Sequence, residues 1–180
     1  MREEIRISGF GGQGVVLAGL ILGKALSLYQ NLEAVMTQSY GPEARGGASS
    51  ANLVVADRPI DYPFIQNTGI LVALSQEAYT KYRPRSGPDA RVFIDDGLVT
   101  PENNDKVHGI PATKLAEELG RRIVANMIML GFLTASVDLI QREAVEEAIK
   151  TSVKSRLVQL NLEAFNVGAR YVTEMENVLE

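Results

Sequence analysis

The sequence predicts a three-layer α/β sandwich, in which helices cover both faces of a mainly parallel sheet and a helical part follows at the C-terminal end. Short apolar runs of strand length alternate with helical patterns up to residue 110, as a parallel sheet requires. From Pro111 onward the pattern is helical throughout. A length of 180 residues with 46% hydrophobic content predicts a single domain over residues 1–180.

The first predicted unit is a strand over residues 3–8, a glycine-rich loop and a helix over residues 14–30. The helix is predicted because apolar residues recur at helical spacing and so form one broad buried face. This face consists of Val15, Leu17, Ala18, Ile21, Leu22, Ala25 and Leu26. A second strand over 34–38, a loop over 39–47 and an extended apolar segment over 52–56 follow.

Residues 70–74 form a continuous apolar run, which is expected of a central strand buried on both faces of the sheet. A short helix over 76–82, a loop over 84–88 and a strand over 91–95 follow it. In the helical part, Pro111 can begin a helix because its missing N–H would be unpaired there. After a stop at Gly120, the pattern predicts helices over 122–136, 142–155 and 157–175.

Composition and charge exclude several classes of protein. The formal net charge is −4 and the pI is near 5.2, so the sequence predicts no nucleic-acid partner. Residues 1–6 are charged and contain no apolar signal stretch, which predicts a cytoplasmic protein. The longest apolar stretch, residues 123–140, is interrupted by polar residues and therefore predicts a buried helix or helix pair, not a membrane span.

The chain lacks most of the side chains that carry redox and metal chemistry. It contains no cysteine, so it cannot supply a thiolate nucleophile, a disulfide or the ligands of an iron–sulfur cluster. It contains a single histidine, His108, which excludes a histidine-based metal site and a two-histidine proton relay. We interpret His108 as an ordinary residue at a strand end. No catalytic residue and no metal ligand is therefore predicted.

The segment GFGGQG at residues 9–14 stands at the predicted strand-to-helix junction and is the first candidate binding site. Glycine adopts positive φ and exposes its N–H, and a helix N-terminus attracts anions, so this Rossmann-like unit predicts a phosphate cradle. The candidate ligand-binding residues here are Gly9, Gly11, Gly12, Gln13 and Gly14.

Two other interpretations of the glycines remain open. A dinucleotide site also needs an acid at the end of the second strand, but Glu33 lies at its beginning, and Thr37, Gln38 and Ser39 occupy its end. This weakens an NAD interpretation. Alternatively, the glycines only allow close packing between helix and sheet.

A second loop, residues 39–47, starts where the second strand ends, so in a parallel sheet it would lie beside the glycine loop. Its Arg45 is placed to contact an anion, with hydroxyl groups of Ser39, Tyr40, Ser49 and Ser50 as further donors. The simpler alternative is a solvated pair of Glu43 and Arg45 on a turn. The candidate binding residues in this loop are Ser39, Tyr40, Gly41, Arg45, Gly46 and Gly47.

Magnitudes limit what the two loops can do alone. A helix N-terminus contributes about 0.3–1 kcal/mol to anion binding, and a charged hydrogen bond adds about 1.5–3 kcal/mol. A micromolar site needs about 8 kcal/mol. Tight binding therefore requires a further surface, which points to a partner chain.

Two other polar features receive no role in catalysis. Asp95-Asp96-Gly97 is interpreted as a turn after a strand and not as an acid–base pair, and Asn126 receives no chemical role.

Four segments carry a resemblance to a known family: GFGGQGVVLAG at 9–19, TQSYGPEARGGASS at 37–50, LVALSQEAY at 71–79 and IPATKLAEELG at 110–120. Together they resemble the gamma subunit of 2-oxoacid:ferredoxin oxidoreductases. The SYGPEARGG form is most similar to the 2-oxoglutarate branch. The likeness covers nearly the whole chain, and the second segment is its most specific part.

The resemblance implies a supporting subunit in an enzyme that oxidatively decarboxylates a 2-oxoacid to an acyl-CoA and passes electrons to ferredoxin. It implies that thiamine diphosphate and the iron–sulfur clusters are held by other subunits (alpha, beta and a ferredoxin-like delta). This chain then holds no cofactor firmly and shares coenzyme A with its partners, through Gly9–Gly14 and Ser39–Gly47, with Arg45 as the charged contact.

Other functions stay open at the level of sequence. One is a stand-alone Rossmann-type nucleotide-binding enzyme, and another is a scaffold whose glycine loops only pack against a partner. If the chain is a subunit of the oxidoreductase complex, the isolated chain is expected to be inactive, and it can be a monomer or a homodimer. The 2-oxoacid and the direction of the reaction are not encoded in the segments that carry the resemblance.

Overall fold

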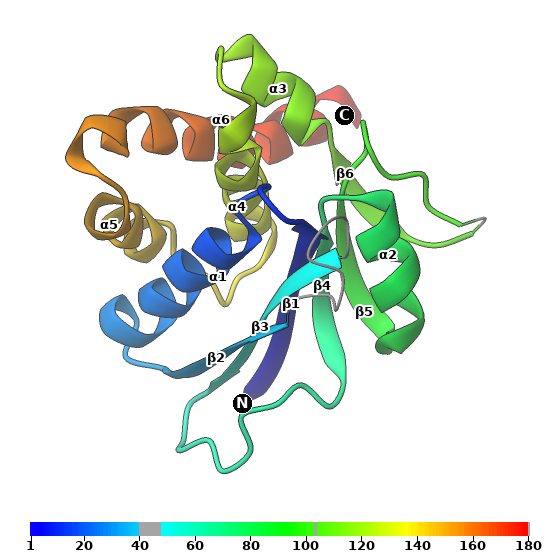
Figure 1. Cartoon of the computed structure of the whole chain (residues 1–180), viewed down its shortest axis with the longest axis vertical. Coiled ribbons are helices and arrows are strands. Elements are labelled where there is room, and N and C mark those ends of the chain that lie inside the picture. Colours follow the sequence, from blue (N-terminus) through cyan, green and yellow to red (C-terminus); the bar gives the residue numbers. More distant parts are fainter. Residues whose placement is uncertain (40–47, 103, 180) are drawn as a thin grey trace.

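The structure is a computed structural model that describes residues 1–39, 48–102 and 104–179. Within these residues, six strands form one sheet in the order β2-β3-β1-β4-β5-β6 (Figure 1). The strands are β1 (Arg2–Phe10), β2 (Glu33–Ser39), β3 (Ala48–Ala56), β4 (Thr68–Ala73), β5 (Ser86–Asp95) and β6 (Val107–Ile110).

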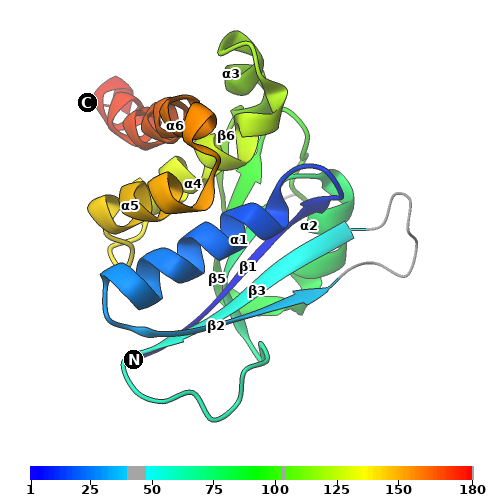
Figure 2. The same cartoon turned by 60° about the vertical axis from the view of Figure 1, so that its left-hand side comes forward.

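The helices are α1 (Val15–Lys24), α2 (Gln76–Tyr82), α3 (Ala112–Glu118), α4 (Ala125–Ser136), α5 (Arg142–Ser152) and α6 (Val158–Leu179). A π-helical turn (Ala25–Tyr29) extends α1, and 3-10 turns lie at Arg83–Arg85, Arg122–Val124 and Ser155–Leu157. Figure 2 shows α1, α4, α5 and α6 on one face of the sheet and α2 on the other. The prediction of a three-layer α/β sandwich with a helical C-terminal part is confirmed.

The sheet is mainly parallel, with one exception. Strand β1 pairs in parallel with β4, β4 with β5, and β5 with β6, whereas β3 is antiparallel to both of its neighbours, β1 and β2. The stretch between Ser39 and Ala48 is too short for the crossover helix that a parallel pair needs, so β2 and β3 can only be antiparallel neighbours. β2 nevertheless runs in the same direction as β1.

The core lies on both sides of the central strands. In β4, Ile70 and Val72 pack into the larger cluster under α1 and α4, while Leu71 and Ala73 pack into a smaller cluster under α2. These four side chains are at most 2% exposed, so both sides of β4 are shielded from solvent. The prediction that residues 70–74 form a central strand buried on both faces is therefore confirmed.

The longest C-terminal helix is held by an unusually close contact with α4. A Cβ added at Gly131 in α4 would meet the backbone of Phe165, and one added at Gly168 in α6 would meet the backbone of Ile128. The two helix backbones therefore touch, and α4 is pressed between α6 and the sheet. This contact fixes the start of α4 at the carboxyl edge of the sheet.

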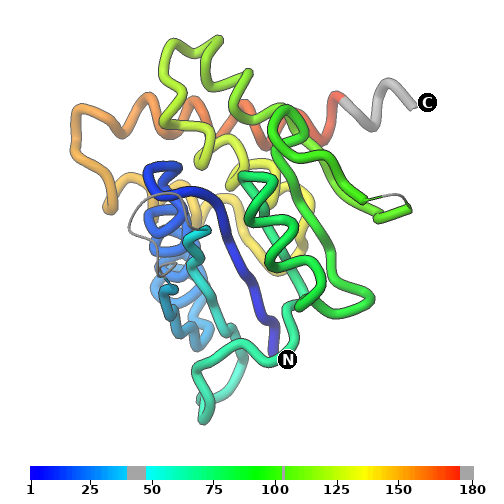
Figure 3. The backbone as a smooth tube through the Cα atoms, turned by 45° about the vertical axis from the view of Figure 1, so that its right-hand side comes forward, coloured from blue at the N-terminus to red at the C-terminus, as the bar shows by residue number. Residues whose placement is uncertain are grey.

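Some predicted boundaries are wrong by several residues. β5 begins at Ser86, inside the predicted loop over 84–88, and its pairing with β4 is irregular where Gly87 and Pro88 lie. The bounds of the short edge strand β6 were not predicted, but the interpretation of His108 as a residue near a strand end is confirmed, since His108 is the second residue of β6. Figure 3 shows the N-terminus at the edge of the sheet opposite the C-terminal helix. There the N-terminal ammonium group contacts the Asp57 carboxylate at 2.8 Å.

Candidate functional site

The glycine loop joins β1 to α1 at the carboxyl edge of the sheet. Gly14 is the N-cap of α1, with φ 73° and ψ 24°, and no side chain caps the helix or places an acid in its first turn. Within the described residues, the N–H groups of Gly11, Gly12 and Gly14 donate no hydrogen bond. The beginning of α1 therefore presents several unpaired donors together with the positive end of the helix dipole.

Gln13 holds this loop in shape. Its Oε1 accepts a hydrogen bond from the Phe10 N–H at 2.7 Å, and its Nε2 donates to the Leu74 carbonyl at 2.8 Å. A Cβ added at Gly9 would collide with the same Oε1, so Gly9 serves this packing. In contrast, Gly11 and Gly12 have open space around the position of a Cβ. The predicted glycine site thus divides into a packed part and an open part.

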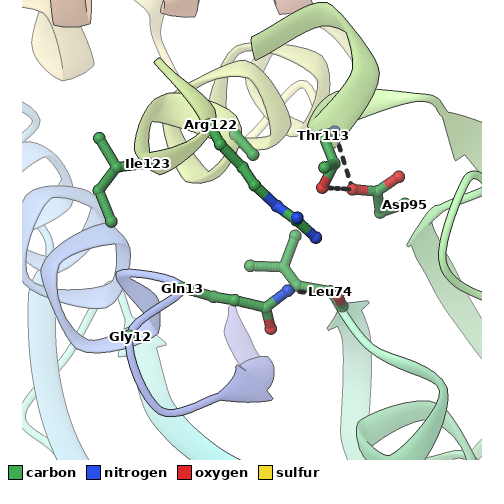
Figure 4. Close-up of a pocket in the computed structure, with 8 residues that line it drawn as sticks. Gly12, Gln13, Leu74, Asp95, Thr113, Arg122 and Ile123 are labelled. Carbon is green, nitrogen blue, oxygen red and sulfur yellow. Dashed lines mark hydrogen bonds between the residues drawn. The ribbon is translucent and has the colours of Figure 1, made fainter. Parts of the chain in front are cut away.

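The open part borders a pocket of about 290 Å³ at the carboxyl ends of β1, β4 and β5 (Figure 4). Ligands of open α/β sheets bind at this edge. The pocket is lined by Gly12, Gln13, Leu74, Asp95, Thr113, Arg122, Ile123 and Ala125. The glycine loop, two strand ends and the start of two helices are therefore brought together around one concavity.

Arg122 supplies the cationic side chain of the pocket. Figure 4 shows its side chain extending across the pocket from the turn before α4 toward the side where Asp95 and Thr113 lie. The side chain is 66% exposed, and its contact with Glu117 is a loose 3.8 Å between charged groups that are both solvated. The guanidinium is thus available to an anion that enters beside the glycine loop.

Sequence reasoning missed Arg122, although a signal was present. Two arginines, Arg121 and Arg122, precede an apolar helix, where the positive end of the helix dipole disfavours cations. Such a placement favours an anionic partner for these side chains. Asn126, which received no chemical role, proves to be structural: its Nδ2 donates to the Gly14 carbonyl at 3.1 Å and ties α4 to the loop.

Asp95 is a structural residue within the pocket wall. Its Oδ2 accepts hydrogen bonds from the N–H and the hydroxyl of Thr113 at 2.9 and 2.6 Å, and its Oδ1 accepts one from the Gly97 N–H at 3.2 Å. The interpretation of Asp95-Asp96-Gly97 as a turn is confirmed. Burial and the neighbouring Asp95 carboxylate raise the pKa of Asp96 above its usual range.

The ends of the second predicted loop lie at the same edge. Ser39 pairs with Ser50 across β2 and β3, and Ser49 pairs with Gly9 across β3 and β1. The expectation that Ser49 and Ser50 offer free hydroxyls is wrong, because both are buried: Ser49 Oγ donates to the Gly9 carbonyl, and Ser50 Oγ accepts from the Tyr82 hydroxyl. The other predicted residues, Tyr40, Gly41, Arg45, Gly46 and Gly47, lie outside the described residues.

The topology also explains why the dinucleotide fingerprint is incomplete. In that fold the second strand lies beside the first, with its acid near the glycine loop. Here β3 separates β1 from β2, and Glu33 begins β2 at the opposite edge, where it pairs with Ala56. No acid from β2 can reach a ribose held at the glycine loop.

Two further searches cover only the part of the chain that the structure describes. Within it, none of the helices has the combination of length and apolarity needed to cross a membrane. Within the same residues, no three or more acidic or histidine side chains cluster in an arrangement that would hold a metal ion.

Comparison with known proteins identifies the family. The family model for pyruvate ferredoxin/flavodoxin oxidoreductase matches residues 4–171. The 2-oxoglutarate synthase subunit KorC of Methanocaldococcus jannaschii is 48% identical over 180 residues, which is 97% of this chain and 96% of that protein.

Solved structures agree with this assignment. The gamma subunit of a keto/oxoacid ferredoxin oxidoreductase from Geobacter sulfurreducens superposes with a TM-score of 0.83 at 38% identity, over 93% of this chain and 96% of that chain. The 2-oxoglutarate:ferredoxin oxidoreductase of Magnetococcus marinus shares the fold, with a TM-score of 0.82 at 22% identity over 94% of this chain and 31% of that longer chain. These findings confirm the resemblance: the chain belongs to the pyruvate ferredoxin/flavodoxin oxidoreductase family and is a gamma-type subunit of a 2-oxoacid:ferredoxin oxidoreductase complex.

Proposed function

We propose that this gamma subunit serves a 2-oxoglutarate:ferredoxin oxidoreductase and that its glycine loop and pocket hold the phosphate-bearing end of coenzyme A. In the reaction, the 2-oxoacid loses carbon dioxide, its acyl group bonds to the sulfur of coenzyme A, and the electrons released pass to ferredoxin. The choice of 2-oxoglutarate is supported by the 48% identity to a 2-oxoglutarate synthase subunit. The structure of the Magnetococcus marinus enzyme carries 2-oxoglutarate, coenzyme A and succinyl-CoA.

The observation that carries the coenzyme A proposal is the meeting of an uncapped helix start and an exposed arginine, held only by a loose contact with Glu117, at one pocket. The unpaired N–H groups of the glycine loop and the Arg122 guanidinium approach the same volume from opposite sides. Phosphate oxygens accept both kinds of hydrogen bond, and their charge is favoured by the helix dipole.

The pocket cannot hold the whole of coenzyme A. Its volume of about 290 Å³ is at the lower end of the range for small-molecule sites. The helix start and one arginine together contribute only about 2–4 kcal/mol of the roughly 8 kcal/mol that a micromolar site needs. The remaining contacts are proposed to come from the alpha and beta subunits, so the isolated chain binds coenzyme A weakly.

Within the complex, this chain binds and positions, and its companions carry the redox chemistry. A chain without cysteine offers no ligands to an iron–sulfur cluster. In line with the family resemblance, we assign thiamine diphosphate and the clusters to the alpha, beta and ferredoxin-like delta subunits, where the exchange of electrons with ferredoxin then takes place. A cytoplasmic location remains part of this proposal.

The first experiment replaces Arg122 in the assembled oxidoreductase. Arg122→Ala is expected to raise the apparent KM for coenzyme A by about 10- to 100-fold, as the loss of a charged hydrogen bond predicts, and to change the KM for the 2-oxoacid little. Arg122→Lys should recover part of the effect. Arg58→Ala, a change of an exposed arginine at the opposite edge of the sheet, is the control. An unchanged KM for coenzyme A, with the subunit still associated, would contradict the role of Arg122.

The second experiment tests the residue predicted from sequence and the substrate. Arg45→Ala should also raise the KM for coenzyme A, and the double variant with Arg122→Ala should show a larger increase than either single variant.

The substrate is tested on the assembled enzyme with the natural chain. At equal coenzyme A concentration it should turn over 2-oxoglutarate in preference to pyruvate. Preference for pyruvate would contradict the substrate and leave the coenzyme A site unaffected.

A further inference from the structure

A second hollow lies beside the pocket, on the other side of Ile123, which lines both. It has a volume of about 510 Å³ and runs between the turn at residues 121–124 and the turn at residues 152–157, over the start of α1. We call it the basic groove. The two turns are distant in sequence, and both lie on the face of the sheet that α1 covers (Figure 1).

Three cationic side chains line the basic groove: Arg121, Lys154 and Arg156. All three are exposed, and within the described part of the chain their side chains form no ion pair and no hydrogen bond. No acidic residue is among those lining the groove. By contrast, Arg2 and Arg83 each contact a carboxylate within 3 Å. In a chain of net charge −4, the groove is a local concentration of unneutralised positive charge.

Apolar side chains lie between these cations. Ile123 and Leu157 are 59% and 38% exposed, although both are large and apolar, and Leu17 and Leu160 form part of the floor. A site for a free inorganic anion surrounds the anion with hydrogen-bond donors, and exposed apolar side chains at its entrance contribute nothing to binding. Arginine combined with exposed apolar side chains is instead the composition of a protein–protein interface.

We propose that the basic groove docks an acidic and apolar segment of another subunit of the same oxidoreductase. Charge complementarity favours acidic residues of the partner opposite Arg121, Lys154 and Arg156. The exposed side chains of Ile123 and Leu157 favour apolar residues of the partner between these acidic ones. Because Ile123 also lines the pocket, the docked segment closes one side of the proposed coenzyme A site. This inference uses only the membership of the chain in a multisubunit enzyme and goes beyond the proposed function of the pocket.

The test measures how tightly the gamma subunit binds the remaining subunits, without coenzyme A. The charge-reversal variant Lys154→Glu/Arg156→Glu is compared with Arg58→Glu/Arg85→Glu, which makes the same change in net charge at two exposed positions outside the groove. The groove variant is expected to bind at least about tenfold more weakly than the natural chain, because like charges then face each other, and to show less weakening with added salt. The control variant should stay within about twofold.

Thermal unfolding of both isolated variants establishes that they are folded. Equal affinity of the two variants for the remaining subunits would overturn the proposal. So would a groove variant that associates normally but has a raised KM for coenzyme A, since the groove would then belong to the small-molecule site. The subunit-binding assay contains no coenzyme A, so its result does not depend on the KM measured for Arg122→Ala. The proposal for the basic groove and the proposal for the coenzyme A site can therefore be refuted separately.

A photo-crosslinking residue in place of Leu157 identifies the occupant. In the assembled enzyme, the crosslinked peptide is expected to come from another subunit and to contain aspartate or glutamate beside an apolar residue. Crosslinking only to a second copy of this chain, or only within it, would overturn the assignment of the groove to a companion subunit.

Discussion

The starts of α1 and α2 differ, although both helices follow parallel strands at the same edge of the sheet. In α2, the Ser75 hydroxyl accepts a hydrogen bond from the Ala78 N–H at 3.2 Å, and Glu77 lies in the first turn. In α1, the cap is a left-handed glycine, with neither a capping side chain nor an acid. The fold thus provides a side-chain acceptor at the α2 start and none, within the described residues, at the α1 start.

The start of α3 resembles that of α2. There the Asp95 carboxylate accepts from the Thr113 N–H, so an acid from β5 caps the helix. At this edge, the starts of α2 and α3 each have a side-chain acceptor for a first-turn N–H, whereas the starts of α1 and α4, on either side of the pocket with Arg122, have none. This difference favours a binding role for the glycine loop over a role in packing alone.

The largest expected effect comes from removing the internal cap of α3. Asp95→Ala leaves the N–H and hydroxyl of the buried Thr113, and the N–H of the exposed Gly97, without a carboxylate. The free energy of unfolding should fall by about 3 kcal/mol, as expected for the loss of several charged hydrogen bonds. Denaturant unfolding of the isolated chain measures it, and a loss below 1 kcal/mol would show that water replaces the carboxylate.

The next effect concerns the cap of α1 itself. Gly14→Ala places a Cβ at φ 73°, against the Asn126 side chain. This should cost about 2 kcal/mol of stability, within the range for strained backbone, and should raise the KM for coenzyme A as the loop shifts. Gly120→Ala, also at positive φ but with open space around the added Cβ, is the control for backbone strain without a clash. Equal KM values for both variants would separate the α1 cap from ligand binding.

A third change gives the start of α1 an acidic side chain, as the start of α2 has in Glu77. Gly11→Asp adds an acid where a side chain has open space. The carboxylate should be tolerated by the isolated chain, since the helix dipole favours it by about 0.3–1 kcal/mol. In the assembled enzyme it should repel phosphate and raise the KM for coenzyme A about tenfold or more. Gly11→Asn separates charge from size, and equal effects of the two would argue against an anionic ligand.

A smaller effect is expected at α2. Ser75→Ala removes its cap and should lower the free energy of unfolding by about 1 kcal/mol. Because the α2 start is satisfied internally, kinetics with coenzyme A should be those of the natural chain. A raised KM would show that the two helix starts are not as distinct as their geometry indicates.

The smallest effect is a pH-dependent gain at Asp96. Burial and the Asp95 carboxylate raise the pKa of Asp96, so the folded chain holds this proton more tightly than the unfolded chain does. Its unfavourable contribution is absent below the unfolded pKa and develops as pH rises through the folded pKa. Asp96→Asn should therefore raise the Tm slightly at pH 7 and leave it unchanged near pH 3. A raised Tm at both pH values would assign the gain to something other than charge.

Local sequence patterns predicted the helices, the central strand and the glycine loop. The side-chain contacts that shape the candidate site could not be predicted in this way, because they join residues that are distant in sequence. Periodicity located the helices and the buried run at 70–74 because each pattern lies within one element. The glycine loop was predicted for the same reason. Gln13 could not be assigned its role, since it bonds the Leu74 carbonyl, 61 residues away. Similarly, the occupied hydroxyls of Ser49 and Ser50 depend on β3 pairing with β1, which the local pattern does not specify.

The arginine of the pocket lies between these cases. Arg122 has a local signal, because cations before an apolar helix oppose its dipole, but its partner loop is more than 100 residues earlier in the chain. The close contact at Gly131 and Gly168, which positions the start of α4, is likewise visible only in three dimensions.

The Gln13 bridge has a consequence for turnover. Since this amide already links the Phe10 N–H to the Leu74 carbonyl, the nearby donors are fixed in space before any guest arrives. A preformed receptor pays little conformational entropy on association, so a modest affinity suffices for occupancy. For the proposed coenzyme A site, a loop that is already in its binding shape means that the thioester product can leave without any rearrangement of this segment.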